Sequence, residues 1–134
     1  MSVKIILVDD DPISIFLCRK ILERDQFAND SVSFSNGKQA IEYLDANHNA
    51  LDQSIIFLDI NMPIMGGWEF LDAVNKRSYS NTLSVIMVTS SFDGNERRKA
   101  KEDKLVVAFI EKPIGAESID NIRKICHKII KRES

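Results

Sequence analysis

The feature that most limits how this chain can fold is a regular alternation of apolar runs and amphipathic segments. Five short runs rich in Val, Ile and Phe occupy residues 3–8, 31–34, 54–58, 84–88 and 106–110. Three of them are almost continuously apolar, which is typical of strands covered on both faces. The pattern therefore predicts five β-strands, most of them buried within one sheet.

Segments with a helical spacing of apolar residues follow these runs. The expected apolar stripes are Ile13, Phe16, Leu17, Ile21 and Leu22 after Pro12; Ala40, Ile41 and Leu44; Phe70, Leu71 and Val74; and Ile119, Ile122, Cys126, Ile129 and Ile130. Segment 95–104 is also expected to be a helix, although Ala100 is its one apolar residue. Each stripe predicts a helix that packs one face against the sheet.

A strand followed by a helix, repeated five times, indicates parallel strands joined by right-handed crossovers. The expected fold class is α/β, with three layers: an open, parallel, five-stranded sheet with helices on both faces. No linker and no change of composition divides the 134 residues, so we expect a single domain over residues 1–134.

Composition and charge argue against several functional classes. The chain has 18 basic and 20 acidic residues, a balance that predicts no strong attraction to nucleic acid. No apolar stretch approaches the roughly 20 residues that span a membrane, and the first apolar run stops at Asp9, so we expect a soluble cytoplasmic protein without a signal peptide. Cys18 and Cys126 are too few for a disulfide framework and are expected to be small buried residues.

Polar side chains follow four of the apolar runs at the point where each run ends. They are Asp9 and Asp10 after the first run, Asp59 after the third, Thr89 after the fourth and Lys112 after the fifth. The carboxyl ends of parallel strands lie on one side of a sheet, and ligands of open α/β sheets bind there. We therefore expect these side chains to converge on one rim.

The residue types on this rim point to phosphoryl chemistry. Crowded carboxylates repel one another, and a hard divalent cation with oxygen ligands, most naturally Mg²⁺, offsets that repulsion. Lys112 supplies a positive charge for a bound anion, and the Thr89 hydroxyl can donate a hydrogen bond to a bound oxygen. Such a set suits phosphoryl transfer to a carboxylate, with Asp59 as the nucleophile.

Four motifs stand in an order that resembles a known family. They are "ILVDDDP" (6–12), "IIFLDINMPIMGG" (55–67), "VIMVTS" (85–90) and "FIEKP" (109–113). Together they resemble the receiver domain of two-component response regulators, in the arrangement of the stand-alone chemotaxis regulator, over essentially the whole chain. The resemblance implies a flavodoxin-like fold with the strand order 2-1-3-4-5.

The resemblance also implies a metal site and a phosphoacceptor. Asp59 matches the phosphoacceptor, which is also a metal ligand, and Asp10 matches the carboxylate that binds Mg²⁺ directly. Asp9 matches the acid that acts on the metal mainly through water. Asn61 matches the residue whose backbone carbonyl binds the metal.

A second implied set forms the conformational switch. Thr89 matches the switch hydroxyl, and Phe109 matches the aromatic residue that turns inward when that hydroxyl moves onto the phosphoryl group. Lys112 matches the invariant lysine of the family, and its bond to Pro113 is implied to be cis.

The implied function is a phosphorylation-activated switch that takes its phosphoryl group from a histidine kinase or a histidine phosphotransfer protein. The chain would catalyse only its own phosphorylation and dephosphorylation. Because the last helix uses up the sequence, we expect no output domain, and the output would be partner binding or phosphorelay. Segment 94–104, with the last strand and last helix, is the expected partner surface, and "RRKAK" (97–101) favours an acidic partner.

Three other functions compete with this one. A phosphatase of the haloacid-dehalogenase type needs a second Asp two residues after the nucleophile, where this chain has Asn61. A dinucleotide-binding module needs a glycine-rich turn after the first strand, and "DDDPIS" has no glycine. A degenerate receiver that binds partners without phosphorylation stays open as an alternative.

Two expectations concern helix starts. Asp11 precedes Pro12 and is expected to cap the first helix. Gly66 stands where many receivers have Asp, so the third helix is expected to begin with a weaker cap, at a cost of about 0.5–1 kcal/mol.

Overall fold

Strands and helices alternate in the computed structural model, which describes residues 3–24, 31–49, 52–90, 94–112 and 114–133, without the side chains of 116 and 130–133. The strands are β1 (Val3–Val8), β2 (Val32–Phe34), β3 (Gln53–Leu58), β4 (Leu83–Thr89) and β5 (Val106–Glu111). The helices are α1 (Pro12–Arg24), α2 (Gly37–Asn47), α3 (Gly67–Asn75), α4 (Gly94–Glu102) and α5 (Ala116–Glu133), and a short 3-10 helix, η1 (Ser80–Thr82), precedes β4.

The strands form one parallel sheet in the order β2-β1-β3-β4-β5, which confirms the predicted flavodoxin-like fold class. The chain runs from β1 outward to β2 and then returns across β1 to β3, so the strand order reverses between β1 and β3. At this point Val8 pairs with Leu58, the last residues of their strands. The residues that follow them therefore leave the sheet side by side, at the place where such folds bind ligands.

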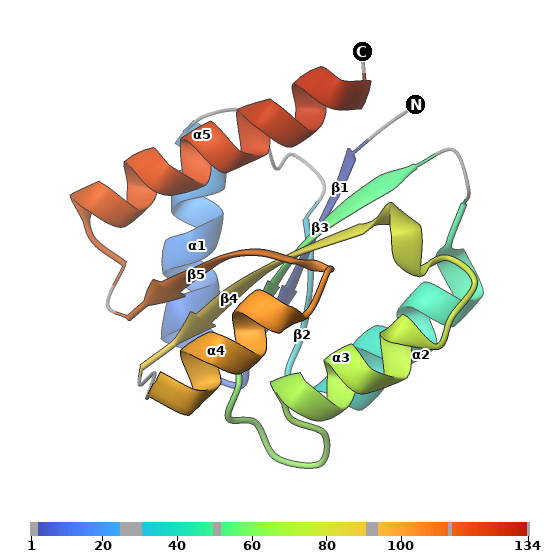
Figure 1. Cartoon of the computed structure of the whole chain (residues 1–134). Coiled ribbons are helices and arrows are strands. Elements are labelled where there is room, and N and C mark those ends of the chain that lie inside the picture. The colour runs from blue at the N-terminus through green and yellow to red at the C-terminus, as the bar shows by residue number, and fades with distance from the viewer. Residues whose placement is uncertain (1–2, 25–30, 50–51, 91–93, 113, 134) are drawn as a thin grey trace.

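Both faces of the sheet are covered, because consecutive residues of a strand point to opposite sides. Ile6 and Val8 belong to the core shared with α2 and α3, whereas Ile5 and Leu7 belong to the core shared with α1 and α5. Figure 1 shows α1 and α5 on one side of the sheet and α2, α3 and α4 on the other. Burial on both faces explains why the central strands read as continuous apolar runs.

The predicted apolar stripes are confirmed for three of the helices. The stripe residues of α2 and α3 are buried, as are Ile122, Cys126 and Ile129 of α5, while Ile119 is half-buried. Ile130 has a side chain outside the described set. Cys18 and Cys126 are both buried and lie in the same core, which confirms their prediction as small buried residues.

The predicted stripe of α1 is wrong in its first half. Ile13, Phe16 and Leu17 are 69%, 58% and 42% exposed. Ile21 and Leu22, the second half of the predicted stripe, are buried as expected, and Cys18 is buried with them. Apolar residues occur all around α1, so their spacing alone does not select the face that is buried.

The helix starts behave as predicted. The Asp11 carboxylate accepts hydrogen bonds from the Ile13 N–H, at 3.0 Å, and from the Ser14 hydroxyl, at 3.1 Å, and so caps α1. Gly66 precedes α3 and supplies no side-chain cap. None of the described helices combines the length and the apolar character that crossing a membrane requires.

Candidate functional site

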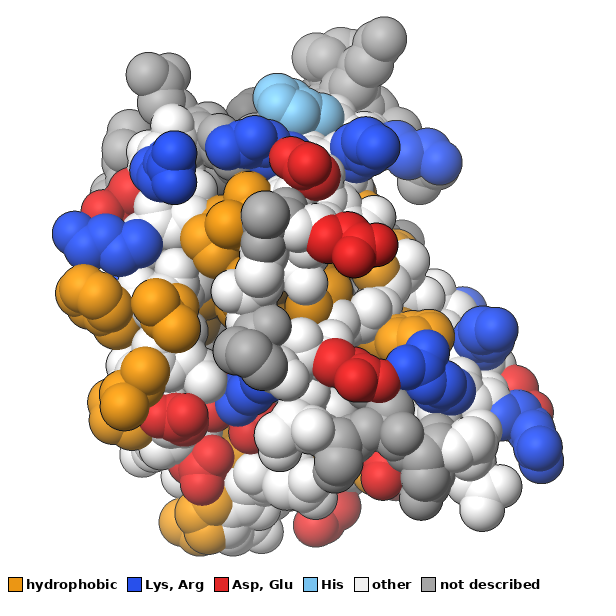
Figure 2. All heavy atoms as spheres, turned by 90° about the vertical axis from the view of Figure 1, so that its left-hand side faces the viewer, with side chains coloured by type: hydrophobic (Ala, Val, Ile, Leu, Met, Phe, Trp, Pro, Cys, Tyr) orange, Lys and Arg blue, Asp and Glu red, His pale blue; other side chains and the backbone are white. Residues whose placement is uncertain are grey.

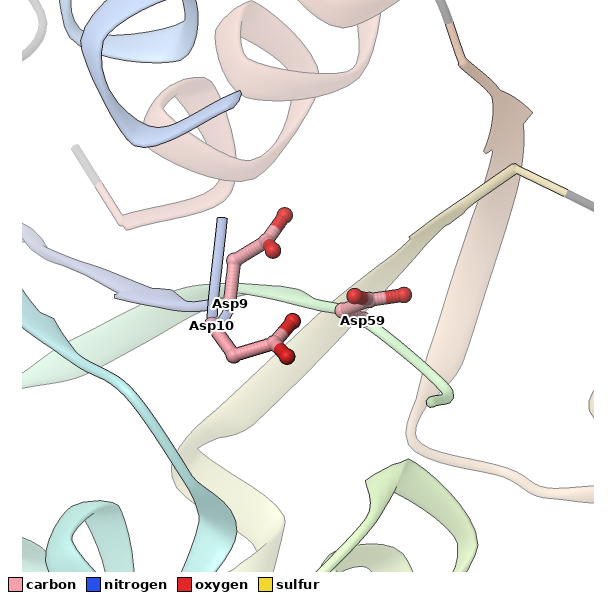
Figure 3. A group of neighbouring side chains, drawn as sticks. All are labelled: Asp9, Asp10 and Asp59. Carbon is pink, nitrogen blue, oxygen red and sulfur yellow. The ribbon is translucent and has the colours of Figure 1, made fainter. Parts of the chain in front are cut away.

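The site lies where β1 and β3 end, and backbone hydrogen bonds continue the sheet one residue beyond each strand. The Asp9 N–H donates to the Phe34 carbonyl at 3.0 Å, and the Asp59 N–H donates to the Val8 carbonyl at 2.9 Å. These bonds fix the backbone of both acids to the rigid sheet. Figure 3 shows Asp9 and Asp10 after β1 and Asp59 after β3, with the side chains of Asp9 and Asp10 extending toward the side on which Asp59 lies.

The three carboxylates are close enough to share one cation. One oxygen from each of Asp9, Asp10 and Asp59 lies within 4.8 Å of the other two. Asp9 and Asp59 are buried, at 9% and 6% exposure, whereas Asp10 is exposed. The cluster therefore has two acids withdrawn from solvent and one acid at its mouth.

Lys112 brings a positive charge to the cluster from the end of β5. Its ammonium nitrogen lies 2.8 Å from Asp9 Oδ2 and 3.5 Å from Asp59 Oδ2. The backbone N–H of Lys112 donates to the Thr89 carbonyl at 2.8 Å. Asp9 Oδ1 also accepts the Asp11 N–H at 2.9 Å. Both oxygens of Asp9 are thus engaged by the protein, and Asp59 shares Lys112 at the longer of the two distances.

The charges of this cluster are only partly balanced. Burial, followed by repulsion from Asp9, raises the pKa of Asp59 to about 6, although Lys112 and the Asn61 backbone N–H act in the opposite direction. Burial opposes the charge of Lys112, but its bonds and charges with Asp9 and Asp59 raise its pKa above the ordinary value. The lysine is therefore a stable cation beside a carboxylate whose negative charge is disfavoured.

Thr89 ends β4 on the same rim. It is 0% exposed, and its hydroxyl oxygen has no hydrogen-bond partner among the described residues. A buried hydroxyl without a partner is uncommon, because it gives up its hydrogen bonds with water and receives none in return. The Thr89 hydroxyl thus has unused hydrogen-bonding capacity at this rim.

The loop after Asp59 depends on a glycine that the sequence reasoning did not single out. The Gly67 N–H donates to the Ile60 carbonyl at 2.8 Å, and a Cβ at Gly67 would lie 2.6 Å from the Asp59 carbonyl oxygen. Only glycine allows α3 to begin so close to this backbone. The second glycine of "MGG" was the signal available in the sequence. Asn61 lies in the same loop, exposed, with its N–H directed to the Asp59 carboxylate.

Phe109 is the predicted site residue that lies apart from the acids. It is half-buried, and its described ring contact is with Arg97 of α4, whose guanidinium carbon is 4.9 Å from the ring centroid. Pro113, and with it the predicted cis bond, lies outside the described residues. The structure therefore gathers Asp9, Asp10, Asp59 and Lys112 directly, with Thr89 and Asn61 around them.

The donor set fits Mg²⁺. The cluster offers carboxylate oxygens, which are the ligands that this hard cation prefers, and the raised pKa of Asp59 marks negative charge that a cation would relieve. The exposed side of the cluster at Asp10 leaves room for the waters that Mg²⁺ usually keeps.

Comparison with known proteins identifies the family. Residues 5–124 match the family described as the response regulator receiver domain. A protein-glutamate methylesterase/protein-glutamine glutaminase from Methanococcus maripaludis is 33% identical over 132 residues, which cover 98% of this chain and 34% of that protein. The two-component response regulator ORR1 of Oryza sativa subsp. indica is 27% identical over 127 residues, 90% of this chain and 54% of that protein. The chain thus spans about a third of the first relative and about half of the second.

Solved structures agree with this assignment. A two-component response regulator from Cytophaga hutchinsonii superposes with a TM-score of 0.78 at 27% identity, over 96% of this chain and 97% of that chain. A response regulator receiver domain protein from Methanospirillum hungatei has the same fold, with a TM-score of 0.74 at 23% identity over 97% of this chain and 98% of that one. The strand order, the acidic rim and the match over residues 5–124 lead to one conclusion: the chain belongs to the response regulator receiver domain family of two-component systems.

Proposed function

We propose that this chain is a phosphorylation-activated switch in which Asp59 accepts a phosphoryl group from a phosphohistidine. The observation that carries the proposal is the meeting of three carboxylates with Lys112 at the strand-order reversal of the sheet. A histidine kinase or a histidine phosphotransfer protein is the proposed donor. Two curated relatives, a hybrid signal transduction histidine kinase of Dictyostelium discoideum and the autoinducer 1 sensor kinase/phosphatase LuxN of Vibrio harveyi, are consistent with such a partner.

The proposed step transfers the phosphoryl group to a carboxylate oxygen of Asp59. The bond from the donor histidine nitrogen to phosphorus breaks while a bond from the Asp59 oxygen to phosphorus forms, and the imidazole leaves with the electron pair. Lys112, 3.5 Å from Asp59, neutralises the charge that the phosphoryl oxygens bring to the buried pocket. Hydrolysis of the acyl phosphate resets the switch, and no separate substrate is turned over.

Asp10, Asp59 and the Asn61 carbonyl are the proposed metal ligands, with Asp9 acting at a distance while it holds Lys112. When bound, Mg²⁺ would supply positive charge that offsets carboxylate repulsion and the charge of the phosphoryl group. The chain's own contribution is to hold the acids at a fixed spacing on the sheet before the donor arrives.

Thr89 and Phe109 are the proposed switch. The buried Thr89 hydroxyl, which lacks a partner in the described residues, would gain one from a phosphoryl oxygen on Asp59. Movement of Thr89 frees space beside β5, into which Phe109 can turn. A phosphoryl group thereby favours one of two arrangements, because it bonds Thr89 in only one of them.

The exposed apolar side chains of α1 are the proposed landing surface for the donor. Ile13, Phe16 and Leu17 are exposed, and Phe16 also lines an open groove with Asp9 and Asp10. Figure 2 shows this face, with hydrophobic side chains gathered along its left side and acidic side chains directly below them. A donor with an apolar helical surface would cover this patch and bring its phosphohistidine to the acids.

The proposed output is partner binding or onward phosphorelay. Arg97, Arg98, Lys99 and Lys101 are exposed on α4, and this charge favours a downstream partner with an acidic surface. We further propose that residues 1–134 form one domain and that the chain works in the cytoplasm. Two free, buried cysteines fit a reducing compartment.

The test is phosphorylation of the purified chain by a small phosphoryl donor in the presence of Mg²⁺. We expect the mass gain of one phosphoryl group, labile to base and absent when Mg²⁺ is chelated. Asp59→Asn should lose the gain, whereas Asp72→Asn, which alters an exposed aspartate of α3, should keep it. A wild-type chain that gains no mass, yet still captures its partners, would favour the alternative of a receiver that acts without phosphorylation.

A further inference from the structure

Helix α4 is held to the rest of the fold by few apolar contacts. Among its residues, Gly94–Glu102, Ala100 is the only buried side chain. The helix instead places two cations on two aromatic rings. The Arg97 guanidinium lies 4.9 Å from the Phe109 ring centroid on β5, and Lys99 Nζ lies 4.7 Å from the Trp68 ring centroid on α3. Cation–π contacts thus replace part of the apolar packing that anchors the other helices.

The Arg97 contact is the more specific of the two, because the guanidinium engages two residues of one strand. Besides stacking on Phe109, Arg97 donates to the Glu111 carboxylate. Phe109 and Glu111 are two residues apart on β5, so their side chains point to the same face of the sheet. A planar guanidinium can lie flat on a ring and donate to a carboxylate from its edge, whereas an ammonium is a compact point charge with no flat face to stack.

Of the two partners of Arg97, Glu111 connects directly to the acidic rim. Glu111 pairs with Thr89 in the register of β4 and β5, and the next residue, Lys112, contacts Asp9 and Asp59. Phe109 is the aromatic residue that the proposed switch repositions. Arg97 therefore touches the strand at the two places where a phosphoryl signal would leave the site.

We propose that Arg97 is a positioning residue for the switch: it holds Phe109 and Glu111 in the resting arrangement, and its release couples the phosphoryl group to movement of α4. This inference rests on the proposed function of Asp59. In the resting form the stacked guanidinium keeps the ring half-buried beside α4. Inward movement of Phe109 breaks its stack with Arg97. A chain that lacks this stack therefore needs less ligand to switch.

Trp68 provides a readout within the same part of the molecule. It is the only tryptophan of the chain, it contacts Lys99 of α4, and it directly follows Gly67, which packs on the Asp59 carbonyl. The experiment titrates the chain with beryllofluoride, a phosphoryl mimic, in Mg²⁺ and follows Trp68 fluorescence. Arg97→Ala should reach half-saturation at a beryllofluoride concentration about three- to tenfold lower than wild type.

Matched variants separate the stack from the charge. Arg98→Ala removes the same charge from the same helix, and Arg98 makes no ion pair or ring contact within the described part of the chain, so its midpoint should not move. Arg97→Lys keeps the charge without the planar stack and should lie between wild type and Arg97→Ala. A purely structural effect of Arg97 would lower stability without shifting the midpoint. Equal midpoints for Arg97→Ala and Arg98→Ala would overturn the proposal.

Hydrogen exchange of α4 keeps this inference separable from the proposed function. In the unmodified chain, Arg97→Ala should raise amide exchange in residues 94–102 several-fold, and Arg98→Ala should not. If wild type neither binds beryllofluoride nor gains a phosphoryl group, the proposed function fails and the coupling fails with it. If phosphorylation proceeds but α4 exchange is the same in both variants, the proposed function stands and the role of Arg97 is disproved.

Discussion

Two aspartates on different parts of the molecule show how surroundings decide what a carboxylate does. Asp59, after β3, is buried beside Asp9, and burial and then that neighbour raise its pKa to about 6. Asp45, on α2, accepts two bonds from Arg77, at 3.1 and 3.2 Å, and one from the Tyr79 hydroxyl at 2.6 Å. The bonds from Arg77, and then from Tyr79, lower its pKa.

The difference separates a carboxylate that stabilises the fold from one that is available for chemistry. Asp45 has its charge satisfied by protein groups, so an added cation would find little to improve. Asp59 carries charge that its surroundings only partly balance, and Thr89 nearby has a hydroxyl with no partner among the described residues. Unsatisfied groups gathered in one place indicate a binding site more strongly than any one acid does.

Magnesium should produce the largest change in the free energy of unfolding, and it should act through the region around Asp59 and not through the region around Asp45. At about 100 times its dissociation constant, a cation bound to the folded chain raises the free energy of unfolding by about 2.7 kcal/mol. We expect that shift in wild type and in Asp45→Asn, as measured by urea unfolding with and without MgCl₂. Asp10→Ala should lose most of the shift, whereas Asp11→Ala, which removes only the α1 cap, should keep it. Equal shifts in these two variants would contradict the assignment of Asp10 as a ligand.

Asp59→Asn should make the chain more stable when divalent cations are absent. At pH 7 and above, the raised pKa means that ionised Asp59 opposes folding, and the neutral amide removes this repulsion. We expect a gain of about 1–3 kcal/mol in the free energy of unfolding, measured in chelator. Asp72→Asn is the matched control, because Asp72 is exposed in its pair with Lys76 and should change stability by less than about 0.5 kcal/mol. A loss of stability in Asp59→Asn would mean that Lys112 outweighs the crowding of the acids.

Asp45→Asn should have the opposite sign. Removing the charge weakens the bonds from Arg77 and Tyr79, and because the Asp45 side chain is 44% exposed we expect a loss of only about 1–2 kcal/mol at pH 7. Because the pKa of Asp45 is lower in the folded chain than in the unfolded chain, its charge stabilises the fold fully at pH values above the unfolded pKa of about 3.8. This stabilisation is lost as the pH falls through the folded pKa. The gap between wild type and Asp45→Asn in urea unfolding should therefore close below about pH 4. A gap that persists at low pH would show that packing, not charge, holds this region.

The sheet and the acidic rim could be predicted because both follow from local patterns. A continuous apolar run marks a strand covered on both faces. The first such run, residues 3–8, has the same bounds as the observed strand β1, Val3–Val8. The acids stand at the ends of such runs. Parallel topology then places Asp9 and Asp59 together, since Val8 and Leu58 are in register.

Contacts between side chains that are distant in sequence could not be predicted in the same way. Asp45 meets Arg77 and Tyr79 across 32 and 34 residues, and no local pattern pairs them. In the sequence, Arg97 is one of several charged residues in a polar helix, and only the structure shows that Phe109 of β5 lies against it. The prediction that the first half of the α1 stripe is buried was wrong for a related reason. Where apolar residues occur all around a helix, tertiary packing decides which face is buried.

The loop after Asp59 contains the remaining local strain in the described chain. Ile64 has a positive φ of 71°, and it is the central residue of a turn that the Met65 N–H closes on the Pro63 carbonyl at 2.8 Å. A branched side chain is strained in this region, and at 75% exposure it gains little from packing. The strain lies in the loop that follows Asp59, whereas Asp45 has its hydrogen bonds satisfied.

Ile64→Asn should relieve this strain, because Asn adopts positive φ more readily than a branched residue does. We expect an increase of about 1 kcal/mol in the free energy of unfolding, measured by urea denaturation in chelator. Ile64→Val keeps the branched Cβ and should leave stability within about 0.5 kcal/mol of wild type. If Asn and Val behave alike, the turn carries no strain of this kind. A second measurement compares the rate of phosphorylation by a histidine donor protein with the rate of phosphorylation by a small donor. If Ile64→Asn is more stable than wild type but is slowed only with the donor protein, the exposed Ile64 side chain serves the encounter with that partner, at a cost in folding stability.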